Sequence, residues 1–158
     1  MHYLIVFLIS MVPLVELRGA IPYAVTFGLN MPLSYAIAIV GNMLPIPFIF
    51  FFARRVLEWG SKVTWPKGFK WVGKFFVFCL EKGEKGGKAL TEKVGRSTYL
   101  ALLLFVGIPI PGTGAWTGTL AASILDLDFK KSVIHVLAGI VLAGVIMGLV
   151  SYAAVSIF

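Results

Sequence analysis

Two charged side chains interrupt an otherwise apolar run, and they limit the folds that this chain can adopt. Residues 3–52 contain no charged side chain other than Glu16 and Arg18. A charge at the centre of a bilayer costs roughly 2.5 to 3.5 kcal/mol on insertion scales. Membrane proteins tolerate a polar break at that depth where the backbone is buried in protein or lines a cavity. We therefore expect Glu16 and Arg18 to lie beside other segments of the protein, at a site for an ion or a polar substrate.

The composition is that of an integral membrane protein. Of the 158 residues, 59% are hydrophobic and 13% are charged, whereas about 25% of the residues in a soluble domain are charged. We expect one all-α membrane domain, residues 1–158, without a second, soluble domain. Cys79 is the single cysteine, His2 and His135 lie far apart in the sequence, and no nucleophile–base set is present. These features predict no cofactor, no metal site and no enzymatic activity.

The basic residues are concentrated in one central segment. Residues 54–96 carry the entire net charge of +7, because the acidic and basic side chains elsewhere cancel. Lys and Arg beside membrane spans stay in the cytoplasm, so we expect residues 54–97 to be cytoplasmic and to meet anionic membrane lipids rather than nucleic acid. Residues 64–80 predict an amphipathic helix that lies in the headgroup layer. Its apolar stripe consists of Trp65, Phe69, Val72, Phe76 and Leu80.

Only two of the apolar stretches are long enough to span a membrane. Residues 31–53 and 132–158 reach the roughly 20 residues that a span needs. The other stretches are shorter and form two pairs, residues 3–30 and 98–125, each interrupted by residues that break helices. We expect each pair to form a re-entrant helical hairpin. The predicted breaks are Gly19 and Pro22 in the first hairpin and Pro109, Pro111 and Gly112 in the second.

The order of these segments suggests an internal repeat. Residues 1–53 and 98–158 each contain a hairpin followed by a span, and Gly19 can be aligned with Gly114. One full span in each half would give the halves opposite orientations, as in many transporters. The alternative is that both hairpin segments cross the membrane fully as tilted spans. The loop 126–131 separates the two arrangements, because it would be cytoplasmic with hairpins and external with full spans.

The charged pair has candidate functional roles and a structural alternative. Glu16 would take up and release a proton, or bind Na⁺, as the coupling ion. Arg18 would bind an anionic headgroup with its planar fork of donors. The alternative is an ion pair that holds the hairpin tip, which a broken turn allows although residues i and i+2 of a regular helix point apart.

The second break offers candidate residues for binding a substrate. Thr113 lies near the expected start of a helix, where free N–H groups favour anions, and Gly114 would let a ligand approach the backbone. Thr117 adds a hydroxyl group, whereas we interpret Trp116 as a packing residue. Asn42, in the first span, would face the charged pair or form an interhelical hydrogen bond. The alternative for residues 107–118 is a tight turn with small residues for helix packing.

Small residues and prolines shape the two spans. Gly41, Pro45 and Pro47 surround Asn42 and predict a kink in the first span. The last span contains two pairs of small residues at a spacing of four, Gly139 with Ala143 and Gly144 with Gly148. Such pairs permit close helix contacts within the chain or between chains. Because two hairpins and two spans are too few to enclose a pathway alone, we expect a homodimer.

Two motifs, ELRGAIP at residues 16–22 and PIPGTGAWTG at residues 109–118, resemble those of the prokaryotic small multidrug export protein family. This family is distantly related to the DedA (SNARE-associated, VTT-domain) membrane proteins, and the likeness covers nearly the whole chain. The resemblance implies two inward-facing re-entrant hairpins in inverted repeat, in a multi-pass protein of a prokaryotic plasma (inner) membrane. It also implies the movement of lipid-linked or amphiphilic molecules, notably undecaprenyl phosphate and phospholipids, with Glu16 and Arg18 acting in the first hairpin.

Together these features predict a membrane transporter or lipid translocase. The substrate would be an anionic amphiphile, such as a polyprenyl phosphate or a phospholipid, bound between the hairpin tips. Arg18 and the backbone at Thr113 and Gly114 would neutralise its headgroup, and Glu16 would couple its movement to protons or Na⁺. Two alternatives stay open: an exporter of small cationic or amphiphilic drugs that uses Glu16 as the carboxylate partner, and a membrane scaffold that transports nothing.

Overall fold

The computed structural model describes residues 1–64, 70–74, 77, 81 and 98–157, which form helices and turns and contain no strand. The prediction of an all-α chain is confirmed for these residues. The helices are α1 (His2–Met11), α2 (Glu16–Thr26), α3 (Met31–Met43), α4 (Ile46–Phe48), the π-helix η1 (Ile49–Ala53), α5 (Arg54–Lys62), α7 (Thr98–Gly107), α8 (Ala115–Ile124) and α9 (Phe129–Ile157). The predicted interfacial helix 64–80 lies for the most part outside the described residues, although 70–74 are helical.

Among the described residues, two helical segments have the length and apolar composition needed to cross a membrane. Met31–Phe52, with 22 residues, comprises α3, α4 and most of η1, and Phe129–Ile157, with 29 residues, is α9. They correspond to the two predicted spans. α9 begins before residue 132 because Asp128 caps it, accepting a hydrogen bond of 2.9 Å from the Lys131 N–H.

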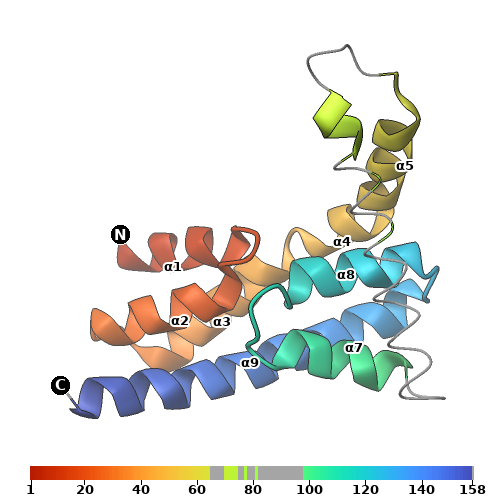
Figure 1. The fold of residues 1–158 in the computed structure, drawn as a ribbon. Helices are drawn as coiled ribbons and strands as arrows, with labels where there is room; N and C mark the ends of the chain where they lie inside the picture. Colours follow the sequence, from red (N-terminus) through yellow and green to blue (C-terminus); the bar gives the residue numbers. More distant parts are fainter. Residues whose placement is uncertain (65–69, 75–76, 78–80, 82–97, 158) are drawn as a thin grey trace.

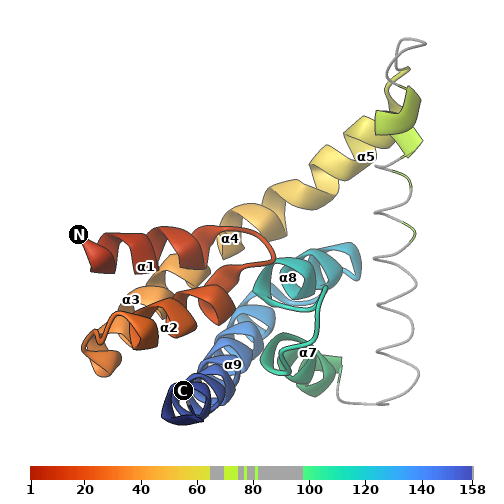
Figure 2. The same ribbon diagram turned by 60° about the vertical axis from the view of Figure 1, so that its left-hand side comes forward.

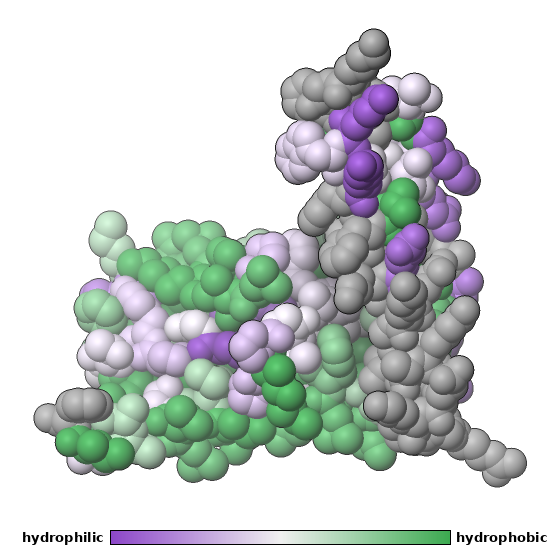
Figure 3. All heavy atoms as spheres, in the orientation of Figure 1, coloured by the Kyte–Doolittle hydropathy of each residue, from purple (hydrophilic) through white to green (hydrophobic). Residues whose placement is uncertain are grey.

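The short helices form two pairs that approach each other from opposite ends of the molecule. The turns of the α1–α2 and α7–α8 pairs meet near the middle, and α9 packs along both pairs (Figures 1 and 2). α1, α7 and α8 have 10 residues each and α2 has 11. Such helices are about 15 Å long, half of a bilayer core of about 30 Å. The surface in Figure 3 is mostly hydrophobic over these pairs and α9, and hydrophilic residues gather around α5.

The turn of the first pair lies earlier in the chain than the sequence predicted. The chain turns at residues 12–15, where Leu14 has a left-handed backbone with φ 68°. Gly19 and Pro22, the predicted breaks, lie inside α2 instead. Pro22 lacks the N–H that the Arg18 carbonyl would bind in a regular helix. α2 nevertheless continues to Thr26, so the loss of one helical hydrogen bond does not end it.

The second turn contains the predicted breakers. Pro109, Pro111 and Gly112 lie between α7 and α8, and Gly112 is left-handed with φ 84°. The alignment of the two halves differs from the predicted one, however. Gly19 is the fourth residue of α2 and Gly118 is the fourth residue of α8, whereas Gly114 precedes α8.

The first span is interrupted near the residues that predicted a kink. α3 ends at Met43, a turn follows at Leu44 and Pro45, and the chain then continues through α4 into the π-helix η1. A proline near a helix end and a π-helical turn are both known causes of helix bending. α5, which the sequence analysis did not predict, then leads away from the helix pairs (Figure 1).

The small residues of α9 are used for contacts within the chain. A Cβ at Gly139 would lie 2.7 Å from the Leu103 carbonyl oxygen, so α7 packs directly against the α9 backbone. The ring of Tyr35 occupies the space beside Gly144 and Gly148, and its hydroxyl donates a hydrogen bond to the Gly144 carbonyl. These contacts hold α9 against α7 in its own half and against α3 in the first half. The expected homodimer would need another surface.

We predict that Gly139→Ala lowers the free energy of unfolding by about 1–3 kcal/mol, the usual cost of overfilling a packed site. The reason is that the new methyl group would collide with the Leu103 carbonyl. Thermal unfolding of the purified protein in detergent measures the effect, and Val141→Ala, at an exposed position of the same helix, is the control. An unchanged melting temperature for Gly139→Ala would contradict the close packing of α7 on α9.

Candidate functional site

Glu16 binds the N-terminus of α8. It is the first residue of α2, is only 3% exposed, and has a left-handed backbone with φ 54°. Its Oε2 accepts a hydrogen bond of 3.1 Å from the Ala115 N–H, and its Oε1 accepts one of 2.9 Å from the Trp116 N–H. The first N–H groups of a helix have no partner within the helix and carry a positive partial charge. Glu16 therefore satisfies and neutralises the start of α8.

Gly114 leaves the space in which the Glu16 carboxylate approaches the backbone of α8. Its φ of 143° is a backbone conformation that L side chains rarely adopt, and a Cβ there would lie 2.5 Å from Glu16 Oε2. The sequence predicted that Gly114 would let a ligand approach the backbone. In the structure, the Glu16 carboxylate makes that approach.

Arg18 binds the end of α7 and the turn that leads from α7 to α8. Its Nη1 donates to the carbonyl oxygens of Ile110 at 2.9 Å and Thr113 at 3.0 Å. Its Nη2 donates to the carbonyl oxygens of Val106 at 2.9 Å and Ile108 at 3.1 Å, and to the Thr113 hydroxyl at 3.0 Å. The last carbonyls of a helix lack helical partners and carry a negative partial charge. The guanidinium therefore closes the turn that follows α7.

The two charges of the first turn thus match the two ends of the second break. Glu16 lies at the positive end of α8, and Arg18 lies at the negative end of α7. The sequence predicted ion and substrate binding, or an ion pair at the hairpin tip. In this structure the hydrogen bonds of both side chains go to the second turn, so the pair joins the two halves of the molecule.

The other predicted binding residues lie in different surroundings. Thr113 belongs to the turn that Arg18 holds, and Thr117 makes a long hydrogen bond of 3.4 Å to the Gly114 carbonyl. Asn42 is buried in α3, and its Oδ1 has no hydrogen-bond partner within the described part of the chain. The hydrogen bonds of Glu16 and Arg18 do not include Asn42.

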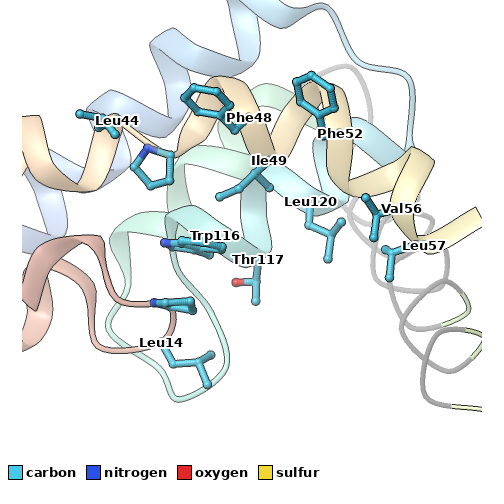
Figure 4. Close-up of a pocket in the computed structure, with 12 residues that line it drawn as sticks. Leu14, Leu44, Phe48, Ile49, Phe52, Val56, Leu57, Trp116, Thr117 and Leu120 are labelled. Carbon is cyan, nitrogen blue, oxygen red and sulfur yellow. The ribbon is translucent and has the colours of Figure 1, made fainter. Parts of the chain in front are cut away.

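An apolar pocket of about 610 Å³ lies next to the junction, by which we mean the contact of Glu16 and Arg18 with the turn between α7 and α8. Its wall comes from the first turn, from residues 44–57, which run from the turn after α3 into α5, and from one face of α8 (Figure 4). The lining residues are Pro13, Leu14, Leu44, Pro45, Phe48, Ile49, Phe52, Val56, Leu57, Trp116, Thr117 and Leu120. Apart from the Thr117 hydroxyl and the Trp116 indole N–H, these side chains are apolar. Pockets of about 300–1,000 Å³ with such linings commonly bind small molecules.

The sequence analysis missed this pocket. Phe48, Phe52 and Val56 recur at a spacing of four and therefore share one helix face, which is a weak signal for an apolar wall. The opposite walls come from Leu14 and Leu120, far away in the sequence. Trp116 was predicted to be a packing residue; its indole lines the pocket, and its backbone N–H donates a hydrogen bond to Glu16.

The described residues hold no group of three or more His, Cys, Asp or Glu side chains that is placed to bind a metal ion.

These features are those of a helical membrane protein: two apolar helices of spanning length, and two short helix pairs that meet beside a pocket. The particular family follows from the sequence: residues 16–146 match the family described as "Putative small multi-drug export protein", and the chain belongs to this family. The match includes both motifs that carried the resemblance. No curated protein and no solved structure matches the chain. The family and the apolar helices indicate a membrane location and a transport role, while the relationship to DedA proteins stays a prediction.

We predict that Arg18→Lys destabilises the protein by about 2 kcal/mol, since a hydrogen bond to a charged group contributes about 1.5–3 kcal/mol. A Lys ammonium is a compact charge that cannot reproduce the fork of the guanidinium. It would leave some of the carbonyls after α7 without donors. Denaturant unfolding in detergent measures the loss, and Lys130→Gln, at an exposed cation of α9, is the control. Wild-type stability of Arg18→Lys would show that these bonds do not hold the halves together.

Proposed function

We propose that this protein is a membrane exporter of small amphiphilic molecules. The observation that carries the proposal is the apolar pocket of about 610 Å³ at the junction of the two helix pairs. Such a pocket suits the apolar part of a small ligand. Membership of the small multi-drug export family supports a transport role.

In this proposal the helix pairs are re-entrant hairpins, and the two halves form an inverted repeat around the pocket. Three observations support this arrangement: each helix of a pair is too short to span, the pairs extend from opposite ends, and their turns meet (Figure 1). Irregular backbone is tolerated at membrane depth where it is buried in protein. The turn between α7 and α8 meets that condition because Arg18 and Glu16 bind its backbone. The basic segment 54–97 would then be cytoplasmic.

The pocket has an exposed apolar rim and a buried floor, which favours entry of an apolar chain. Leu14 and Phe48 at its rim are 67% and 64% exposed, whereas Ile49 and Leu57 at its floor are 7% and 9% exposed. Phe48 and Ile49 belong to the apolar segment Met31–Phe52. If that segment spans the membrane, the medium at the rim is lipid, and an amphiphile dissolved in the bilayer can reach the pocket without crossing water.

An anionic amphiphile, such as a polyprenyl phosphate or a phospholipid, is the substrate class that we favour. The start of α8 binds a carboxylate in the structure, and it would bind an anionic headgroup in the same way once Glu16 withdraws. The withdrawal of Glu16 would couple transport to protons or Na⁺. A cationic drug would instead have to pair with the Glu16 carboxylate, whose two oxygens each already accept a hydrogen bond from α8.

We predict that Leu120→Trp lowers the initial rate of transport about tenfold, because the larger indole would occupy part of the pocket and a loss of about 1.4 kcal/mol in substrate binding is a factor of ten. Proteoliposomes with a fluorescent phosphatidylglycerol as the anionic probe and rhodamine 6G as the cationic probe measure the rate. Val145→Trp, at an exposed position of α9 outside the pocket, is the matched control.

Each result of this experiment separates the candidate functions. Transport at the wild-type rate by a folded Leu120→Trp variant would remove the pocket from the pathway. Movement of rhodamine 6G alone would favour the exporter of cationic drugs. Movement of neither probe by the wild type would favour the membrane scaffold.

The proposed hairpins also predict the side on which Lys130 lies. A cysteine at Lys130, in a Cys79→Ser background, should react with a membrane-impermeant maleimide from the cytoplasmic side, because a re-entrant α7–α8 pair returns to the side that it left. Phe27→Cys, in the loop before α3, should react from the external side in both arrangements and is the control. Reaction of Lys130→Cys from the external side would show that residues 98–125 span the membrane.

A further inference from the structure

Trp116 belongs both to the polar junction and to the apolar pocket. Its backbone N–H donates the hydrogen bond of 2.9 Å to Glu16 Oε1. Its indole forms part of the pocket wall and lies between Leu44 and Leu14 in the close-up (Figure 4). A ligand that fills the pocket therefore touches the same residue that holds the Glu16 carboxylate.

The observed conformation of this junction contains two unfavourable features. The indole Nε1 of Trp116 is buried and has no hydrogen-bond partner within the described residues, which is unfavourable for a donor. Glu16 has a left-handed backbone with φ 54°, which is strained for a residue with a side chain. Gly114, directly before α8, has φ 143°, and glycine changes its backbone angles at little steric cost. A rotation of the first turn of α8 about Gly114 would release Glu16 and move the indole of Trp116.

Resting on the proposed export function, we propose that Trp116 couples the filling of the pocket to the protonation of Glu16. The ligand is an amphiphile with an alkyl chain next to a hydrogen-bond acceptor. The chain displaces the indole in the pocket, and the acceptor binds the indole N–H. The first turn of α8 then rotates, and its backbone N–H groups leave Glu16. A carboxylate that loses its donors in apolar surroundings favours its neutral form, so binding of the ligand takes up a proton.

The groups around Glu16 assign this proton to its carboxylate. Arg18 is the charged group on the same helix, and it is bound to the second turn. Neither α8 nor residues 108–114 carry a titratable side chain. The titratable side chains on α1, α3 and α9, which pack against α2, and on α2 itself are His2, Tyr3, Tyr23, Tyr35, Lys130, Lys131, His135 and Tyr152, and α5, which packs against α8, adds Arg55, Glu58 and Lys62. The hydrogen bonds of Glu16 go to α8 and not to these groups.

Isothermal titration calorimetry of the protein in nanodiscs, in buffers of different ionisation enthalpy, tests this coupling. Dodecyldimethylamine oxide carries an acceptor oxygen, and dodecyltrimethylammonium has the same chain without an acceptor; both are used below their micellar concentrations. We expect the wild type to bind the amine oxide several-fold more tightly and to take up a proton. Trp116→Phe keeps an aromatic ring but has no N–H. We expect this variant to bind both compounds, with the several-fold preference and the proton uptake lost.

Two further variants and one control complete the test. Glu16→Gln should bind the amine oxide without taking up a proton. Gly114→Ala is a second test that keeps the carboxylate: its Cβ would lie 2.5 Å from Glu16 Oε2 and displace it in advance, so that binding again takes up no proton. Trp59→Phe removes an exposed indole outside the pocket and should behave like the wild type.

Retention of proton uptake by Trp116→Phe would overturn the coupling, and so would proton uptake by Glu16→Gln. The proposed function fails separately from this inference. Coupled binding without transport in proteoliposomes would refute export and leave the role of Trp116 standing. Transport by a wild type that binds the amine oxide without proton uptake would refute the role of Trp116 and leave export standing.

Discussion

Glu16 and Arg18, two residues apart in the sequence, bind the two helix ends that face the turn between α7 and α8. The end of α7 and the start of α8 expose carbonyl and N–H groups, and no water would be present at bilayer depth to bind them. Glu16 accepts two of these N–H groups, and Arg18 donates to the carbonyls on the other side of the turn. Each charge also faces the helix end of opposite sign. The turn between α7 and α8 depends on this pair, which also adds polar contacts between the halves to the packing of α2 and α3 against α9.

The same interaction limits how the protein can work. Charges that hold the halves together are not available to a substrate, so transport requires that the junction opens. A ligand can shift a conformational equilibrium only by its difference in affinity for the two states. The pocket beside the junction gives a place where that difference can arise, because Trp116 forms its wall and also donates to Glu16.

The segments that could be predicted from the sequence are those whose signal is local. Span length and apolar composition identified Met31–Phe52 and α9, since both depend only on neighbouring residues. The turn of the first pair was predicted wrongly, because Gly19 and Pro22 are typical helix breakers and yet lie inside α2. The true turn uses left-handed backbone at Leu14 and Glu16, residue types that rarely adopt it. At Glu16, the hydrogen bonds to the start of α8 offset the backbone strain of that conformation.

By itself, the sequence determined that Glu16 and Arg18 must contact protein, because the bilayer offers nothing to bind a lone charge. It also determined the family, through motifs that lie within residues 16–146. Only the tertiary structure decided which groups meet the pair, namely N–H groups and carbonyls from the turn between α7 and α8. It also decided that a pocket forms from the first turn, residues 44–57 and α8. A local sequence pattern shows which side chains must be buried or bound, whereas the packing of helices that are distant in the sequence determines which groups bind them.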